Sequence, residues 1–103
     1  MIELRRDFHR NPELGFAEIR TSEKIAVFLE NLGFKVRRGI AETGLAAVWP
    51  GNDPKAAAVA FRADMDALPL EEENTHDFVS LQKGRMHACG HDGHMAVLLG
   101  LAV

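Results

Sequence analysis

The sequence of 103 residues predicts an α/β fold. Two observations lead to this prediction. A clear amphipathic helix pattern in the first third is followed by apolar runs of strand length, and an apolar helix pattern closes the sequence after a polar stretch. The resulting order is helix, helix, strand, strand, strand, loop, helix, which is typical of α/β proteins. The length fits one small domain.

The composition excludes several classes of protein. The chain has 12 basic and 15 acidic residues and no basic stripe, so we expect no nucleic-acid partner. A single cysteine cannot form an intrachain disulfide, which excludes the disulfide framework of a small secreted protein. No apolar run approaches the roughly 20 residues that cross a bilayer, and the N-terminal stretch is charged from its third residue. We therefore expect a cytoplasmic protein without a membrane partner.

Two helices open the predicted fold. Residues 2–10 suit a short helix that ends before Pro12, because the residue preceding a proline is disfavoured in the helical conformation. Residues 17–32 carry the clearest periodicity of the sequence. Four apolar side chains fall at positions i, i+3, i+4 and i+7 and form one stripe: Ile25, Phe28, Leu29 and Leu32. Gly33 follows directly and is suited to end the helix.

Three runs of strand character come next, at residues 34–38, 44–50 and 56–66. The third begins as a continuous apolar run, which is typical of a strand buried on both faces. The segment 50–55, PGNDPK, is dense in turn-forming residues. We therefore expect the second and third runs to pair as an antiparallel hairpin across this turn.

The polar segment 71–85 predicts a surface loop. Its acidic run, Glu71–Glu73, is interpreted as a solvated face of that loop. His9 and His76 are isolated histidines, and no pattern around either of them indicates a site.

The last predicted helix covers the apolar run HMAVLLGLAV, residues 94–103. It has no capping glycine, basic last turn or proline after it. Helices at chain ends are usually polar, because they fray in water. We therefore expect that Val103 truncates a larger domain, and that apolar surface over residues 95–103 causes the chain to self-associate.

The strongest candidate site is the segment MHACGHDGH, residues 86–94, which holds the only cysteine and three of the five histidines. Cys89 and His91 offer a thiolate and an imidazole, which are favoured ligands of zinc and related divalent metals. Alternatively, Cys89 is a small buried hydrophobic residue and His91 begins a helix. His87 and His94 could each complete a metal site, support a ligand by a hydrogen bond, or bind substrate.

A second candidate is the segment FRADMDALP, residues 61–69. Asp64 and Asp66 stand two residues apart at the end of the third predicted strand, so their side chains are expected on the same side. In open α/β sheets, ligands bind outside the carboxyl ends of the strands. The two carboxylates could bind metal, orient a ligating histidine or tune a proton. Alternatively, they solvate and cap a loop that Pro69 shapes.

The segments RRDFHRNPELGF, FRADMDALP and MHACGHDGH, in this order, resemble those of a family of metal-dependent amidohydrolases. The family includes hippurate hydrolase, N-acyl-amino-acid amidohydrolase and the plant hydrolases of auxin–amino-acid conjugates, within the aminoacylase–carboxypeptidase metallopeptidases. The resemblance runs from about Leu4 to Val103. It implies the N-terminal part of a zinc-peptidase-like catalytic domain with a mixed β-sheet between helices. An inserted domain often dimerises such proteins, so a homo-oligomer is expected.

The resemblance also implies chemistry. Family members hold one or two divalent ions, commonly zinc or manganese, and hydrolyse the amide bond of N-acyl amino acids. By motif position, Cys89 and His91 are the metal ligands, and Asp66 is the active-site aspartate that orients a ligating group. Many relatives in the wider clan have a metal-binding histidine where this chain has Asp64. That departure is normal for the cysteine-containing branch, and it leaves the role of Asp64 open.

The general base of the family is a glutamate that lies well downstream of these motifs, as do the remaining metal ligands and the inserted domain. We therefore expect hydrolysis in the complete enzyme, with this chain supplying two metal ligands and inactive alone. Two alternatives stay open. One is a non-enzymatic domain that binds a metal through Cys89 and His91, with His87 or His94. The other is a degenerate remnant in which the motif has no function.

Overall fold

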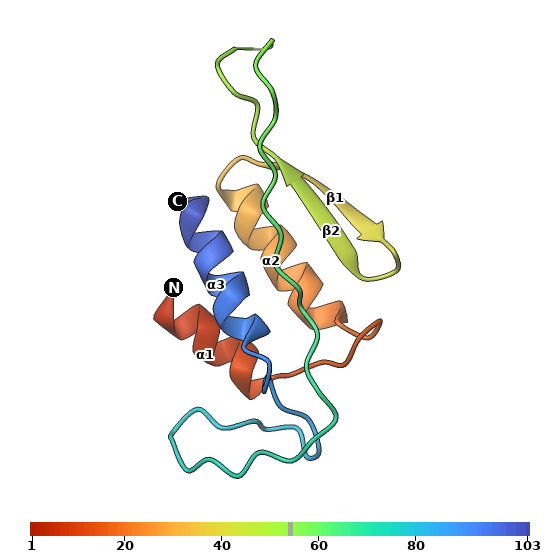
Figure 1. Cartoon of the computed structure of the whole chain (residues 1–103), viewed down its shortest axis with the longest axis vertical. Helices are drawn as coiled ribbons and strands as arrows, with labels where there is room; N and C mark the ends of the chain where they lie inside the picture. Colours follow the sequence, from red (N-terminus) through yellow and green to blue (C-terminus); the bar gives the residue numbers. More distant parts are fainter. Residues whose placement is uncertain (54) are drawn as a thin grey trace.

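The computed structural model describes residues 1–53 and 55–103 and confirms the α/β prediction (Figure 1). Over these residues the chain forms three helices and a two-stranded sheet. In chain order the elements are α1 (Ile2–Arg10), α2 (Ile19–Asn31), β1 (Lys35–Ile40), β2 (Gly44–Val48) and α3 (His91–Leu101).

The first two helices lie where the sequence predicts them. The α1 helix has the predicted bounds, and α2 begins two residues later and ends one residue earlier than predicted. Gly33 ends α2 with a φ of +91°, a backbone conformation that glycine adopts without steric cost. Its N–H donates to the carbonyl of Glu30 at 2.9 Å, and the N–H of Phe34 donates to that of Leu29 at 3.0 Å. These bonds satisfy carbonyl groups that the helix end leaves without partners.

The hairpin of the structure differs from the predicted one. The strands β1 and β2 pair antiparallel, from Lys35 opposite Val48 to Ile40 opposite Gly44. The turn between them includes Ala41 and Glu42, both with positive φ. The predicted pairing of residues 44–50 with 56–66 is therefore wrong, because the shorter connection between the first two runs makes the turn. Pro54, within the predicted turn at 50–55, lies outside the described residues.

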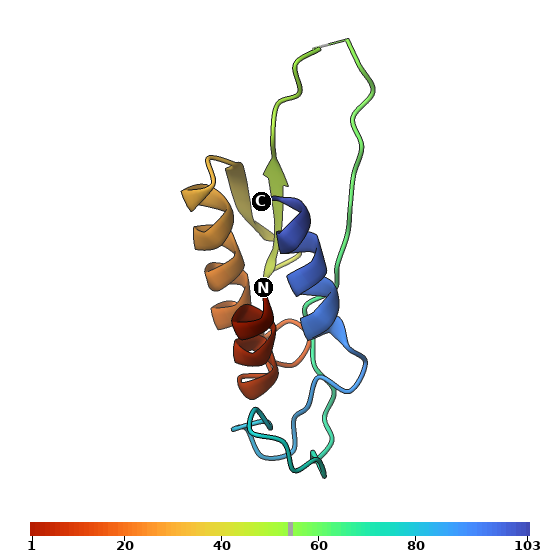
Figure 2. The same ribbon diagram turned by 90° about the vertical axis from the view of Figure 1, so that its left-hand side faces the viewer.

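Residues 56–66 are not a buried strand. They form no strand in the structure, and Val59 and Phe61 expose 78% and 64% of their surface. Figures 1 and 2 show this segment as a long extended run, which returns from beyond the hairpin toward the beginning of α3. Ordered pairing resumes only at Ala67, which forms an isolated parallel bridge with Leu14, and at Leu68, which pairs with Met86.

The core lies where the three helices meet. Five buried apolar side chains form one cluster from α1, α2 and α3: Phe8, Ile25, Leu29, Met95 and Leu99. Burying a side chain of this size contributes about 1.5–3 kcal/mol. The hairpin packs on α2 through partly buried residues such as Val36 and Leu45. The packing of α3 on α1 holds the first turn of α3, which contains His91, beside α1.

Over residues 1–53 and 55–103, no helix has the length and apolar character needed to cross a membrane.

Part of the last helix exposes apolar surface, as predicted. Val97, Leu101 and Val103 expose 75%, 60% and 83% of their surface, whereas Met95 and Leu99 belong to the core. We expect the 103-residue chain to self-associate through this surface, because contiguous apolar surface is rarely left in water. Size-exclusion chromatography with light scattering, over a range of protein concentrations, measures the mass of the particles and so their oligomeric state.

Replacing both Val97 and Leu101 with lysine should shift the chain to the monomer, because two charges resist burial. Val27→Lys is the matched control, because Val27 is a partly exposed apolar residue on a different helix. A wild-type chain that stays monomeric at all concentrations would contradict the prediction.

Candidate metal centre

The candidate segment forms a turn that leads into α3. Gly90 precedes the helix with a φ of +84°, and its carbonyl accepts from the N–H groups of Gly93 and His94 at 3.0 and 3.1 Å. A side chain at this position would strain the backbone, since L-residues rarely adopt this conformation. The turn places Cys89 two residues before the first residue of the helix, which is His91.

Asp66 holds the ring of His91. The Nδ1 atom of His91 lies 2.9 Å from the backbone oxygen of Asp66 and 3.0 Å from its carboxylate Oδ1. A carbonyl oxygen only accepts hydrogen bonds, so Nδ1 carries a proton and the lone pair of the neutral ring lies on Nε2. Histidines that bind metals usually have their second nitrogen held in this way. Asp66 is predicted to orient a metal ligand, and this contact with His91 is the one that such a role requires. The roles of Asp66 and His91 in a metal site stay predictions.

Cys89 is exposed and forms no disulfide. This exposure contradicts the alternative in which Cys89 packs as a small buried hydrophobic residue. The other half of that alternative is right, because His91 is the first residue of α3. A thiol at the surface and an imidazole whose second nitrogen is available suit a thiophilic divalent ion such as zinc.

The remaining candidates lie in different environments. His94 is exposed, and its ring centroid is 5.9 Å from that of His91. His87 is buried, and neither ring nitrogen has a hydrogen-bond partner among the described residues. Burial lowers the pKa of His87 and keeps the ring neutral. Asp64 forms an exposed ion pair with Arg62 at 2.8 Å. Residues 56–66 form no strand, so the strand geometry from which the Asp64 and Asp66 side chains were expected on the same side is absent.

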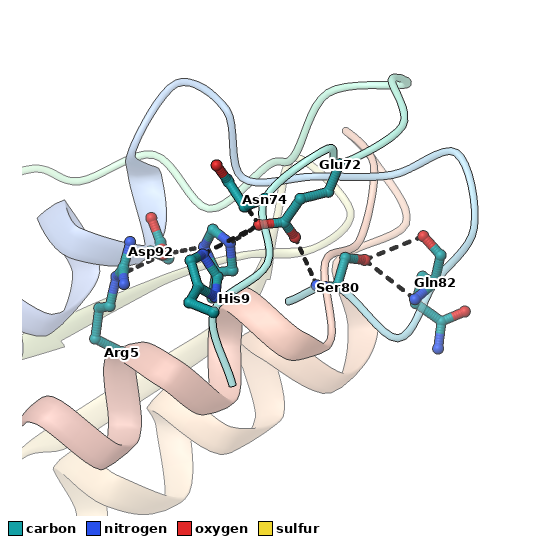
Figure 3. A network of polar contacts seen from close by, with 8 residues as sticks. Arg5, His9, Glu72, Asn74, Ser80, Gln82 and Asp92 are labelled. Atoms are coloured by element: carbon teal, nitrogen blue, oxygen red, sulfur yellow. Dashed lines mark hydrogen bonds and ion pairs between the residues drawn. The ribbon is translucent and has the colours of Figure 1, made fainter. Parts of the chain in front are cut away.

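A buried polar network connects α1, α3 and the loop at 71–85 (Figure 3). His9 is 3% exposed and lies at its centre. Its Nδ1 is 2.7 Å from Asp92 Oδ2, and its Nε2 is 3.0 Å from Glu72 Oε1. Arg5 Nε also contacts Asp92 Oδ2, at 2.8 Å. His76 Nε2 lies 3.3 Å from the same oxygen of Glu72.

Glu72 is buried, so the interpretation of Glu71–Glu73 as a solvated face is wrong at its central residue. Only 3% of the Glu72 side chain is exposed. Burial acts to raise its pKa, but hydrogen bonds from the Ser80 N–H at 2.6 Å, from Asn74 at 3.0 Å and from His9 outweigh it. These contacts lower the pKa of Glu72 to about 2. Its neighbours Glu71 and Glu73 are exposed, as predicted.

The network also corrects the interpretation of His9 and His76 as isolated histidines. Of the residues that the structure describes, His9, Glu72 and His76 form a group of three possible metal ligands whose atoms all lie within 4.8 Å of one another. No local sequence signal marks this group, because Glu72 is 63 residues from His9. The i, i+4 spacing of Glu72 and His76 is the only pattern that could have drawn attention to it.

Fold and donor set together define an α/β protein with a candidate metal centre at the beginning of α3. Residues 60–103 match the model of peptidase family M20/M25/M40. The chain is 48% identical to thermostable carboxypeptidase 2 of Saccharolobus solfataricus over 97% of its own length and 25% of that protein. It is 46% identical to N-acyl-L-amino acid amidohydrolase of Geobacillus stearothermophilus, over 99% of its own length and 27% of that protein.

A solved structure has the same fold as this chain. The YXEP protein of Bacillus subtilis, described as a dinuclear metal binding peptidase from the M20 family, superimposes with a TM-score of 0.91 at 41% identity. The match covers 98% of this chain and 28% of that one. The chain is therefore similar to peptidase family M20/M25/M40, and the resemblance to metal-dependent amidohydrolases is confirmed. It spans about a quarter of the length of the curated relatives it matches.

The low pKa of Glu72 predicts a specific loss of stability in acid. A carboxylate whose pKa is lowered on folding, here from 4.5 to about 2, stabilises the folded chain above pH 4.5. That contribution is lost as the pH falls from 4.5 toward 2, and it amounts to at most about 3 kcal/mol. Glu72→Gln should remove it at pH 7 and should flatten the dependence of unfolding free energy on pH in this window.

Urea unfolding between pH 2 and pH 7, with a chelator present, measures this effect. Glu73→Gln is the matched control, since Glu73 is an exposed neighbour in the same loop. Equal loss of stability in the two variants would show that Glu72 has no special role.

Proposed function

We propose that this chain supplies part of the active site of a metal-dependent amidohydrolase that cleaves the amide bond of N-acyl amino acids. The observation that carries the proposal is the contact between His91 Nδ1 and Asp66, which leaves Nε2 as the ligand atom. Cys89, two residues earlier and exposed, provides the thiolate. Together they hold one ion of a site for one or two divalent ions, zinc or manganese.

The chain's own residues act by binding and orienting. Cys89 and His91 hold the ion, and Asp66 fixes the tautomer and direction of the imidazole. When bound, such an ion polarises the scissile carbonyl and lowers the pKa of a bound water from 15.7 to as low as about 7. The thiolate favours zinc among the candidate ions. Asp66 is a positioning residue on this proposal, because it acts through His91.

The substrate class rests on the relatives. The Geobacillus relative is an N-acyl-L-amino acid amidohydrolase and another, from Arabidopsis thaliana, is an IAA-amino acid hydrolase. Both names describe an acyl group joined to an amino acid by an amide bond. The name of the Saccharolobus relative, a carboxypeptidase, supports a second candidate, in which the group removed is the C-terminal residue of a peptide. Cytoplasmic location and a homo-oligomer belong to the same proposal.

Replacing either metal ligand should abolish hydrolysis. In the complete polypeptide that contains this chain, Cys89→Ala and His91→Ala should each lower kcat/KM for N-acyl amino acids by at least about 100-fold, because a site that loses a ligand binds its ion weakly. Metal content by mass spectrometry and hydrolysis of N-acetyl amino acids and dipeptides measure both effects and separate the two substrate classes. The isolated 103-residue chain should show no turnover.

Unchanged activity in Cys89→Ala would sink the proposal and favour the degenerate remnant. A complete polypeptide that shows no hydrolysis, but loses its bound metal in the Cys89→Ala and His91→Ala variants, would favour the non-enzymatic metal-binding domain.

The positioning role of Asp66 has its own test. Asp66→Asn keeps the backbone carbonyl that contacts His91 and removes the carboxylate charge, so we expect a loss of about 10–100-fold in metal affinity or activity. Asp64→Asn is the matched control, because Asp64 pairs with Arg62 at the surface. A larger effect of Asp64→Asn than of Asp66→Asn would contradict the assignment.

A further inference from the structure

We propose that His9, Glu72 and His76 form a second divalent-cation site, suited to zinc, that shares no ligand with Cys89 and His91. Two imidazoles and one carboxylate are a ligand set that zinc accepts, with a fourth position left for water. The three ligand atoms come from α1 and from the loop at 71–85, and they all lie within 4.8 Å of one another. The site goes beyond the proposed hydrolytic function.

The distances suit a small ion. Glu72 Oε1 lies 3.0 Å from His9 Nε2 and 3.3 Å from His76 Nε2. Bonds from zinc to nitrogen and oxygen are about 2.0–2.1 Å long, so ligand atoms in a tetrahedral site are separated by about 3.3–3.4 Å. The three side chains therefore need only small shifts to enclose an ion in place of the protons they now share.

His9 is oriented as a zinc ligand would be. Its Nδ1 lies 2.7 Å from Oδ2 of the fully buried Asp92, and Arg5 holds that same oxygen. Nδ1–H donates to this carboxylate, so Nε2 is the ring atom that faces Glu72, and a bound ion would take the place of the hydrogen that Nε2 now donates to it. The combination of carboxylate, histidine and metal recurs in zinc sites, because the carboxylate fixes the ring and raises its basicity.

Glu72 is fixed as well. The Ser80 N–H holds its Oε2 at 2.6 Å, and Asn74 contacts Oε1 at 3.0 Å, so the carboxylate is oriented before any ion arrives (Figure 3). A ligand that is already ordered loses little freedom on binding, and that raises the affinity.

His76 provides the open side of the site. Its ring stacks on Phe78 with centroids 3.8 Å apart, which holds Nε2 toward Glu72. The side chain is 31% exposed, so an ion and a water ligand can reach the cluster from solvent. A bound ion would join the loop at 71–85 to α1, and through Asp92 to the first turn of α3.

Zinc binding to a variant that lacks the other candidate site tests the proposal. In the full chain carrying Cys89→Ser and His91→Ala, titration with zinc against a chromophoric chelator should give one bound equivalent. X-ray absorption should show nitrogen and oxygen neighbours without sulfur. Adding His76→Ala should lower the affinity by at least 100-fold. Asp77→Asn is the matched control, because Asp77 is the exposed acidic neighbour of His76 and should leave the affinity unchanged.

Two outcomes would overturn the proposal. One is absence of bound zinc in the Cys89→Ser, His91→Ala chain. The other is equal affinity with and without His76→Ala. In either case the cluster is a metal-free network in which the His9 ring bridges Asp92 and Glu72. A cadmium-113 resonance of the wild-type chain, at a shift typical of nitrogen and oxygen ligands, provides a second measurement that needs no variant, and its absence counts against the site.

Discussion

The carboxylate of Asp92 is the contact on which the rest of the structure depends. It is fully buried, and its Oδ2 contacts both Arg5 and His9 of α1, at 2.8 and 2.7 Å. A buried charge costs several kcal/mol unless it is paired, so removal of either partner leaves an uncompensated group. Asp92 stands in the first turn of α3, and its pairing therefore fixes where that helix begins relative to α1.

His91 takes its position from this arrangement. Its backbone belongs to the turn that Asp92 anchors, and its ring is held by Asp66 from the other side. The contact joins segments that are far apart in the sequence, since His9 and Asp92 are 83 residues apart. The apolar cluster of Phe8, Met95 and Leu99 brings the same two helices together from within the core. Packing sets the approach of α1 and α3, and the ion pairs set their register.

Interactions between near neighbours in sequence could be predicted, and those between distant segments could not. The stripe along α2 and its end at Gly33 depend on residues a few positions apart, and both were predicted. The choice of strand partner for residues 44–50 depends on which of two neighbouring runs reaches it, and periodicity carries no such information. The burial of Glu72 depends on His9, so its acidic neighbours in sequence were misleading. The run at 56–66 has the composition of a buried strand, but the described residues give it no partner.

The same local chemistry occurs twice in this small structure. Asp66 contacts Nδ1 of His91, and Asp92 contacts Nδ1 of His9, so in both pairs a carboxylate holds Nδ1 and directs Nε2 away from itself. The surroundings differ. His9 Nε2 faces the buried carboxylate of Glu72, which suits a hard or borderline cation. His91 has an exposed thiol two residues away, which suits a softer ion. The Asp92–His9 pair is buried, whereas 38% of the Asp66 side chain and 15% of the His91 side chain are exposed, so solvent reaches the second pair more readily than the first.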